Sequence, residues 1–142
     1  MAYWLFKSEP NTWGWDEQVA KGEVGEQWDG VRNYQARNNM REMKLGDLGF
    51  FYHSVNEKQI VGIVEICAEI HPDTTTDDPR WECVDVKAVA PVPRPVTLAQ
   101  IKAEPRLENF ALVKQSRLSV VPVSDDEWAL ICEMAGYAGR GS

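Results

Sequence analysis

The sequence contains no run of eighteen consecutive apolar residues, which is close to the length that a helix needs to cross a lipid bilayer. Its first ten residues, MAYWLFKSEP, have neither the basic start nor the long apolar stretch of a secretory signal peptide. We therefore expect a cytoplasmic protein that has no membrane partner.

Cysteine is scarce: the chain has three, and none of them forms a Cys-x-x-Cys pair. Zinc sites draw on closely spaced Cys and His, so no zinc site is expected. Asp73, Asp77 and Asp78 lack the spacing and the closing Glu of an EF-hand calcium loop. We predict reduced, mostly buried thiols and neither a metal nor another cofactor.

Internal repeats, low-complexity segments and interdomain linkers are also missing. A chain of 142 residues with 44% hydrophobic residues and six Trp is long enough and apolar enough for one packed core. We expect a single domain over residues 1–137, a flexible tail at 138–142, and a monomer.

The chain has fewer basic than acidic side chains, 15 Lys and Arg against 22 Asp and Glu. Its formal net charge of −7 argues against non-specific nucleic-acid binding, because such binding depends on neutralising phosphates. The charge is unevenly spread, however. Residues 28–44 hold four basic and two acidic side chains, whereas residues 65–85 hold seven acidic side chains and one Arg. One positive face on an acidic protein permits local binding of a nucleic acid with a specific feature.

The most informative stretch runs from Gln27 to Asp47, and it is predicted to be a turn followed by an amphipathic helix. Ala36, Met40 and Met43 recur at helical spacing, which gives the helix an apolar face. Gly46 is the residue type that commonly follows a helix end, so we expect the helix to stop at Gly46–Asp47.

The other face of this helix carries polar groups from Asn33, Arg37 and Arg41. Together with the indole of Trp28, these amides and guanidiniums are groups that stack on a nucleobase and hydrogen-bond its edge or its phosphate. The alternative is a solvated basic face beside a core tryptophan, and this stretch alone leaves both interpretations open.

Aromatic, β-prone composition or alternation of apolar and polar residues predicts the strands. These are Tyr3–Lys7, Leu48–Ser54, Ile60–Ile70, Trp81–Ala90 and Ser116–Val123. The second and third are expected to form an antiparallel hairpin. Residues 22–27 and 72–80 are expected to be polar loops, and the prolines at 91, 93 and 95 are expected to end the fourth strand.

Short helices are predicted at Trp15–Lys21, after Thr97 and after Ser124. Thr97 with Gln100, and Ser124 with Glu127, have the spacing of capping boxes. Strands interleaved with short helices indicate an α+β fold whose small mixed or antiparallel sheet could close into a barrel.

Several long motifs resemble the EVE domain family, which includes the thymocyte nuclear protein group, and they extend over most of the chain. They are Tyr3–Pro10 (YWLFKSEP), Trp28–Asn38 (WDGVRNYQARN), Gly46–Asp47, Phe50–Ser54 (FFYHS), Ile60–Ile63 (IVGI) and Gln115–Ser119 (QSRLS). The resemblance implies a PUA-like fold, a small β-barrel with flanking short helices, related to the YTH readers of methylated RNA bases. It also implies binding of a modified base in DNA or RNA without catalysis. Because the sequence starts at the domain, we expect a stand-alone bacterial member.

The resemblance also assigns site residues by position. Those matched to base contacts are Lys7, Ser8, Glu9, Trp28, Asn33, Tyr34, Tyr52, His53, Ser54 and, in a variable loop, Trp81. Those matched to phosphate contacts are Arg32, Arg37, Asn38, Gln115, Ser116 and Arg117.

Other interpretations of these residues stay open. An enzyme acting on nucleotides or nucleic acid could use His53 or Glu9 as an acid or base, although no Gly-x-Ser-x-Gly elbow is present. A structural adaptor is a third class. Arg117 could instead form a structural ion pair with Asp47 or Glu9. The indoles at positions 13 and 15 could simply pack the first helix on the sheet.

Overall fold

Six strands and five α-helices make up residues 1–139, which the computed structural model describes; residues 140–142, the end of the expected tail, lie outside the described residues. The strands are β1 (Tyr3–Ser8), β2 (Glu26–Gln27), β3 (Leu48–His53), β4 (Gln59–Pro72), β5 (Glu82–Thr97) and β6 (Val120–Val123). The helices are α1 (Trp15–Ala20), α2 (Tyr34–Arg41), α3 (Leu98–Ala103), α4 (Ala111–Lys114) and α5 (Asp125–Ala135), with 3₁₀ turns η1 (Gly22–Val24) and η2 (Pro105–Leu107).

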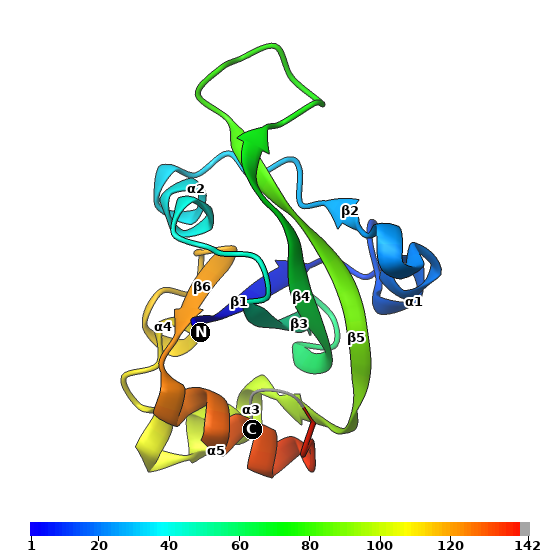
Figure 1. The fold of residues 1–142 in the computed structure, drawn as a ribbon. Helices are drawn as coiled ribbons and strands as arrows, with labels where there is room; N and C mark the ends of the chain where they lie inside the picture. The colour runs from blue at the N-terminus through cyan, green and yellow to red at the C-terminus, as the bar shows by residue number, and fades with distance from the viewer. Residues whose placement is uncertain (140–142) are drawn as a thin grey trace.

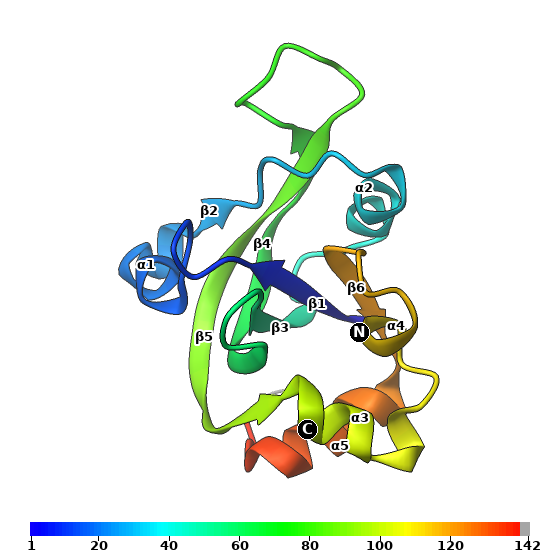
Figure 2. The same cartoon turned by 180° about the vertical axis from the view of Figure 1, so that it is seen from behind.

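All six strands belong to one mixed sheet in the order β2-β5-β4-β3-β1-β6. β1 pairs in parallel with β3, and the other four pairings are antiparallel. The α+β class, the mixed sheet and the β3–β4 hairpin are therefore confirmed. The sheet is strongly curled (Figures 1 and 2). Within residues 1–139 its edge strands β2 and β6 do not pair with each other, and α2 contacts both β5 and β6.

The core is built on β3, in which every residue is buried. From the C-terminal helix α5, the fully buried Trp128 stacks on Phe50 of β3 at 4.1 Å between ring centroids and on Tyr3 of β1 at 4.4 Å. Trp128 is thus a core residue. No helix within residues 1–139 is long and apolar enough to cross a membrane.

The prediction that prolines end the fourth strand is wrong, because β5 continues through them to Thr97. Pro91, Pro93 and Pro95 are all exposed and alternate with the buried Val92 and Val96. β2 pairs with β5 only at residues 85 and 86, so the prolines lie where β5 is a sheet edge and no partner needs their missing N–H.

Helix α2 ends at Arg41, five residues before the predicted stop. Met43 is buried as expected, but it lies in the turn that follows, where its N–H donates to the Met40 carbonyl. The Asp47 side chain accepts a hydrogen bond from the Lys44 N–H at 3.0 Å and so replaces a helical carbonyl as the acceptor. A side-chain acceptor placed after a helix competes with its continuation.

Two further boundaries differ from the predictions. Glu26–Gln27, expected to be loop, forms the short strand β2, and the predicted strand from Ser116 begins only at Val120. In the segment before β6 the Leu118 N–H donates to the Gln115 carbonyl at 3.0 Å, which makes a turn there. Both differences lie beside the cavities described below.

Asp47 is a buried carboxylate that fastens the start of β1 to the turn before β3. Besides the Lys44 N–H, it accepts hydrogen bonds from the Ala2 N–H and the Trp4 indole N–H, each at 3.2 Å. Arg117 forms no ion pair with Asp47 or Glu9 in the part of the chain that the structure describes, so neither structural pairing considered for it is present.

We predict that Asp47→Ala lowers the free energy of unfolding by about 2 kcal/mol, since it leaves the buried Trp4 indole N–H and two part-buried backbone N–H groups without their acceptor. Asp47→Asn should cost less, because one oxygen remains as an acceptor. Denaturant unfolding of both variants and the parent chain measures this. Equal stability of Asp47→Ala and the parent chain would contradict it.

Candidate nucleobase-binding site

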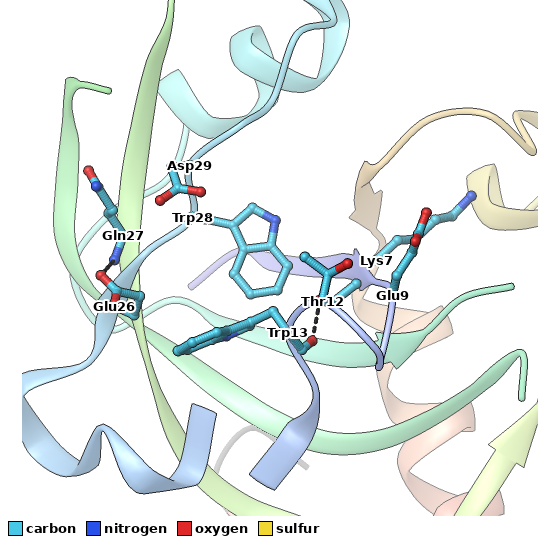
Figure 3. Close-up of a pocket in the computed structure, with 9 residues that line it drawn as sticks. Lys7, Glu9, Thr12, Trp13, Glu26, Gln27, Trp28 and Asp29 are labelled. Atoms are coloured by element: carbon cyan, nitrogen blue, oxygen red, sulfur yellow. Dashed lines mark hydrogen bonds between the residues drawn. The ribbon is translucent and has the colours of Figure 1, made fainter. Parts of the chain in front are cut away.

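A cavity of about 420 Å³ opens where β1 ends, between the loop that leads to α1 and the strand β2. We call it the indole cavity because two tryptophan side chains line it (Figure 3). Its lining residues are Lys7, Ser8, Glu9, Thr12, Trp13, Glu26, Gln27, Trp28 and Asp29. Ligand pockets in proteins commonly have volumes of about 300–1,000 Å³, so one planar ring system fits.

Trp28 forms the inner wall of the indole cavity. It is 8% exposed, and its ring packs edge-on against Phe6 and Phe51, with centroids 5.1 and 5.6 Å away. Its backbone N–H donates to the Val84 carbonyl at 2.8 Å, which continues the pairing of β2 with β5. The indole is therefore held by the core on one side and lines the cavity on the other.

Trp13 supplies the second indole, seen on edge beneath the Trp28 ring in Figure 3. Its indole N–H donates to the Gln18 side-chain oxygen at 3.0 Å, and the buried Gln18 amide donates to the Val86 carbonyl at 3.0 Å. The Ser8 hydroxyl donates to the Trp13 carbonyl. Sequence reasoning missed Trp13 as a lining residue, although its position shortly after the motif at residues 7–9 was a usable signal.

The rim of the indole cavity carries three carboxylates, Glu9, Glu26 and Asp29, and one lysine. The Glu26 carboxylate forms an ion pair with Lys21 at 3.1 Å, so the net negative charge comes from the other two. Burial raises the pKa of Asp29, the nearby Asp73 and Glu26 carboxylates raise it further, and Arg32 opposes them. Partial burial lowers the pKa of Lys7. The Lys7 ammonium points away from Trp28 (Figure 3) and donates to the Ser116 carbonyl at 2.8 Å. Such a rim accepts hydrogen bonds from a neutral ligand and repels an anion.

Asp73, in the β4–β5 loop, fixes the backbone beside the cavity. This buried carboxylate accepts hydrogen bonds from the Gly30 N–H at 2.9 Å, from Arg32 at 3.1 Å, and from the N–H and hydroxyl of Thr75. Burial raises its pKa, but the hydrogen bonds from Thr75, Gly30 and Arg32 outweigh that effect and lower the pKa to about 2.

A second hollow, of about 290 Å³, lies between the start of α2 and the turn before β6. We call it the amide hollow, and it is lined by Asn33, Gln35, Gln115, Ser116, Arg117 and Leu118. Asn33 caps α2, because its side-chain oxygen accepts the Ala36 N–H at 2.9 Å. Three residues matched to phosphate contacts, Gln115, Ser116 and Arg117, thus share one hollow with Asn33, which was matched to a base contact.

Tyr34 and Trp81 line neither cavity but stack on each other, with ring centroids 5.1 Å apart. The Arg37 guanidinium lies 4.9 Å from the Tyr34 centroid and donates to the Arg80 carbonyl at 2.8 Å. Arg37 also donates to the Asn38 side-chain oxygen at 2.9 Å. This cluster joins α2 to the β4–β5 loop, and its rings already have partners.

Tyr52 and His53 are buried at the end of β3 and do not line the indole cavity. Nε2 of His53 accepts the Trp15 N–H at 3.1 Å, and Nδ1 lies 2.8 Å from the Glu57 carboxylate. Hence Nδ1 carries the proton, and both ring nitrogens are engaged. Ser54 starts the following turn, where its N–H donates to the Ser8 carbonyl. The expected site residues are therefore divided among the indole cavity, the amide hollow, the stacked cluster and the core.

The structure is a small α+β domain with a curled mixed sheet, a helix across its open side and a cavity walled by two indoles. Within residues 1–139 no group of three or more His, Cys, Asp or Glu side chains is arranged to hold a metal ion. The family model of the EVE domain matches residues 2–134. The chain belongs to the EVE domain family.

Similar proteins span bacteria and animals. A crystal structure from Agrobacterium tumefaciens is 55% identical, with a TM-score of 0.97 over 100% of this chain and 98% of that one. Human thymocyte nuclear protein 1 is 34% identical over 94% of this chain and 73% of its own length. A crystal structure of human THYN1 in complex with DNA containing 5-methylcytosine is 33% identical, with a TM-score of 0.88 over 98% of this chain and 100% of that one.

The implied relationship to YTH domains is confirmed as a likeness of fold. The YTH domain of Zygosaccharomyces rouxii MRB1 aligns with a TM-score of 0.57 at 15% identity, over 97% of this chain and 88% of that one.

We predict that Asp73→Asn lowers the free energy of unfolding at neutral pH by roughly 2.5 kcal/mol, the value that corresponds to a pKa shift from 3.8 to about 2. Because the folded-state pKa is depressed, this contribution is present above about pH 4 and disappears as the pH falls towards 2. Unfolding measured across that range checks it, with the exposed Asp77→Asn as the control. A difference between parent and variant that is independent of pH would contradict the role of the carboxylate.

Proposed function

We propose that this chain binds a modified nucleobase of a nucleic acid in the indole cavity and catalyses no reaction on it. The observation that carries the proposal is a cavity walled by two anchored indoles, Trp13 and Trp28, at the end of β1. Stacking of a base on an aromatic ring contributes about 1–3 kcal/mol and requires a ring already in position. The human relative in complex with DNA containing 5-methylcytosine supports the same class of ligand.

The rim of the cavity favours a base that carries an exocyclic amino group. Glu9 and Asp29 offer acceptors, whereas Glu26 is paired with Lys21, and carboxylates accept hydrogen bonds from N4 of cytosine. The methyl group of Thr12 and the ring carbons of the two indoles provide apolar contacts for a methyl substituent. We therefore take 5-methylcytosine as the first ligand to test.

A base must leave the helical stack to enter such a cavity. Proteins that bind an extruded base offset the cost of unpairing it with stacking and edge hydrogen bonds, and the cost is smallest in single strands. We accordingly expect this chain to bind a modified single strand at least as tightly as the duplex of the same sequence.

The engagement of His53 argues for binding without catalysis. A general base must reach the proton that it abstracts, and His53 is buried with both ring nitrogens occupied by the Trp15 N–H and the Glu57 carboxylate. Glu9 does line the cavity, and in this proposal it serves as a hydrogen-bond acceptor for the base edge.

We predict that Trp13→Ala weakens binding of a 5-methylcytosine oligonucleotide by about 1–3 kcal/mol and reduces its preference over the unmodified oligonucleotide. Trp13 is half-buried, whereas the nearly buried Trp28 also supports the core, so its removal would mix binding with stability. The matched control is Trp81→Ala, which removes an indole outside the cavity.

Titrations followed by fluorescence anisotropy measure both affinities. If the parent chain binds modified and unmodified oligonucleotides equally, across cytosine and adenine modifications, the proposed function is wrong. If Trp81→Ala reduces the preference as much as Trp13→Ala does, the base is bound elsewhere.

Asp29→Asn should change stability and binding in opposite directions. Because burial and neighbouring carboxylates raise the folded-state pKa of Asp29, its ionised form disfavours folding, so the amide should raise the melting temperature at pH 7. That gain should vanish at about pH 3, where both states are protonated. Affinity for the amino-bearing base should fall about tenfold through loss of a charged acceptor. A variant that loses both stability and affinity would contradict this assignment.

A further inference from the structure

Trp15, the half-buried first residue of α1, attaches that helix to the sheet. Its ring packs edge-on against Phe51 of β3, with centroids 5.3 Å apart. Its backbone N–H donates at 3.1 Å to Nε2 of His53, two residues further along the same strand. Because α1 has only six residues, it is too short to be stable alone in water, and its position depends on contacts of this kind.

Gly62 of β4 lies directly beneath the Trp15 ring. It is the cross-strand partner of Phe51, so a side chain at position 62 would point to the same face of the sheet as the Phe51 ring. A Cβ added at Gly62 would be closer to the Cη2, Cζ3 and Cε3 carbons of Trp15 than van der Waals contact allows. Glycine within a strand often marks such a close approach. The Trp15–Gly62 contact therefore requires a residue without a side chain.

The Trp15–Gly62 contact is linked to the indole cavity through α1. Trp13 precedes Trp15 by two residues, and its indole N–H donates to the side-chain oxygen of Gln18 on the same helix. Gln18 is itself buried and donates to the Val86 carbonyl of β5. A shift of α1 away from the sheet would therefore move the Gln18 acceptor and the Trp13 ring together.

Both indoles of the cavity are positioned relative to one ring, that of the fully buried Phe51. Phe51 contacts Trp28 directly, with centroids 5.6 Å apart, and it contacts Trp15 on α1. Trp28 lines the cavity, whereas Trp15 does not and acts on the other wall, Trp13. The distance between the two walls thus depends on how closely Trp15 approaches β4.

We propose that Trp15 is a positioning residue of the indole cavity: its contact with Gly62 sets the separation of Trp13 from Trp28 and so determines which bases fit between them. The inference rests on the proposed function for its ligand. It gives Trp15 and Gly62, neither of which lines the cavity, a part in selecting the base.

Three variants of the full chain test the Trp15–Gly62 contact: Gly62→Ala, Trp15→Phe and the two combined. A methyl group at position 62 should lift the indole off β4, whereas a phenyl ring at position 15 is too short to reach that methyl group. The control is Ile131→Ala, which removes a fully buried side chain from α5. Because α5 lies away from α1 in both views (Figures 1 and 2), the control lowers stability without changing the contact.

The first measurement needs no ligand and follows the Trp13 indole N–H by NMR. Gly62→Ala should shift this signal and speed its exchange with water about tenfold, because overpacking loosens the helix that carries its acceptor. The combined variant should return both quantities towards those of the parent chain. Ile131→Ala should leave both unchanged.

The second measurement is the affinity for the single-stranded oligonucleotide with one 5-methylcytosine. Gly62→Ala should weaken binding about tenfold. Trp15→Phe should weaken binding when position 62 is glycine and strengthen it when position 62 is alanine, since residues in contact do not act additively. A general loss of stability cannot produce this change of sign.

The proposal is overturned if Gly62→Ala leaves the Trp13 signal unchanged, or if Trp15→Phe weakens binding equally in both backgrounds. If Gly62→Ala does not fold, Trp15→Phe alone decides, and an unchanged Trp13 signal in that variant overturns the proposal. Failure of the proposed function gives a different result. The Trp13 signals would then follow the expected pattern while the parent chain prefers no modified oligonucleotide, which would support the positioning role and refute base reading.

Discussion

The Asp73 carboxylate is the constraint on which the site depends most. It joins two segments that are far apart in sequence, the turn at Gly30–Arg32 and the β4–β5 loop, and it does so from a buried position. That turn connects Trp28 to α2. The Asp73 carboxylate therefore positions the residues that follow Trp28 at the indole cavity. It also positions the start of α2 beside the amide hollow. Its hydrogen bonds outweigh its desolvation, as the lowered pKa shows.

The division of charge around β1 is consistent with the proposed binding of a nucleic acid by an acidic protein. Carboxylates gather where a neutral base would be inserted, and the hollow beyond Lys7 has none. A net charge of −7 disfavours unselective binding of polyanions, so under the proposed function a strand would be retained only through a base that fits the indole cavity. In this arrangement, selectivity comes from repulsion as well as from contact.

Alternation predicted β4 and the first half of β5 because their burial alternates along much of their length, whereas β3 is buried at every residue and was predicted from its apolar, aromatic composition. Residues 7–9 and Trp28, which the motifs singled out, line one cavity. The sequence pattern did not predict the role of a side chain where that role depends on its neighbours in the folded structure. His53 ends a strand, as expected, but the helix α1 that covers it is distant in sequence. Trp13 was interpreted as helix packing because nothing local shows that Gln18 holds its ring over an opening. The Tyr34–Trp81 stack likewise requires a contact across 47 residues of chain.

The exposed prolines of β5 have a consequence for how this sheet meets other chains. An unpaired strand edge normally offers a row of N–H donors to which an incoming strand can add. At Pro91, Pro93 and Pro95 that row is interrupted at every second residue, while the strand still continues far enough for Arg94 to reach the last carbonyls of α5. The same residues therefore allow a long, continuous strand and make its open edge a poor template for aggregation.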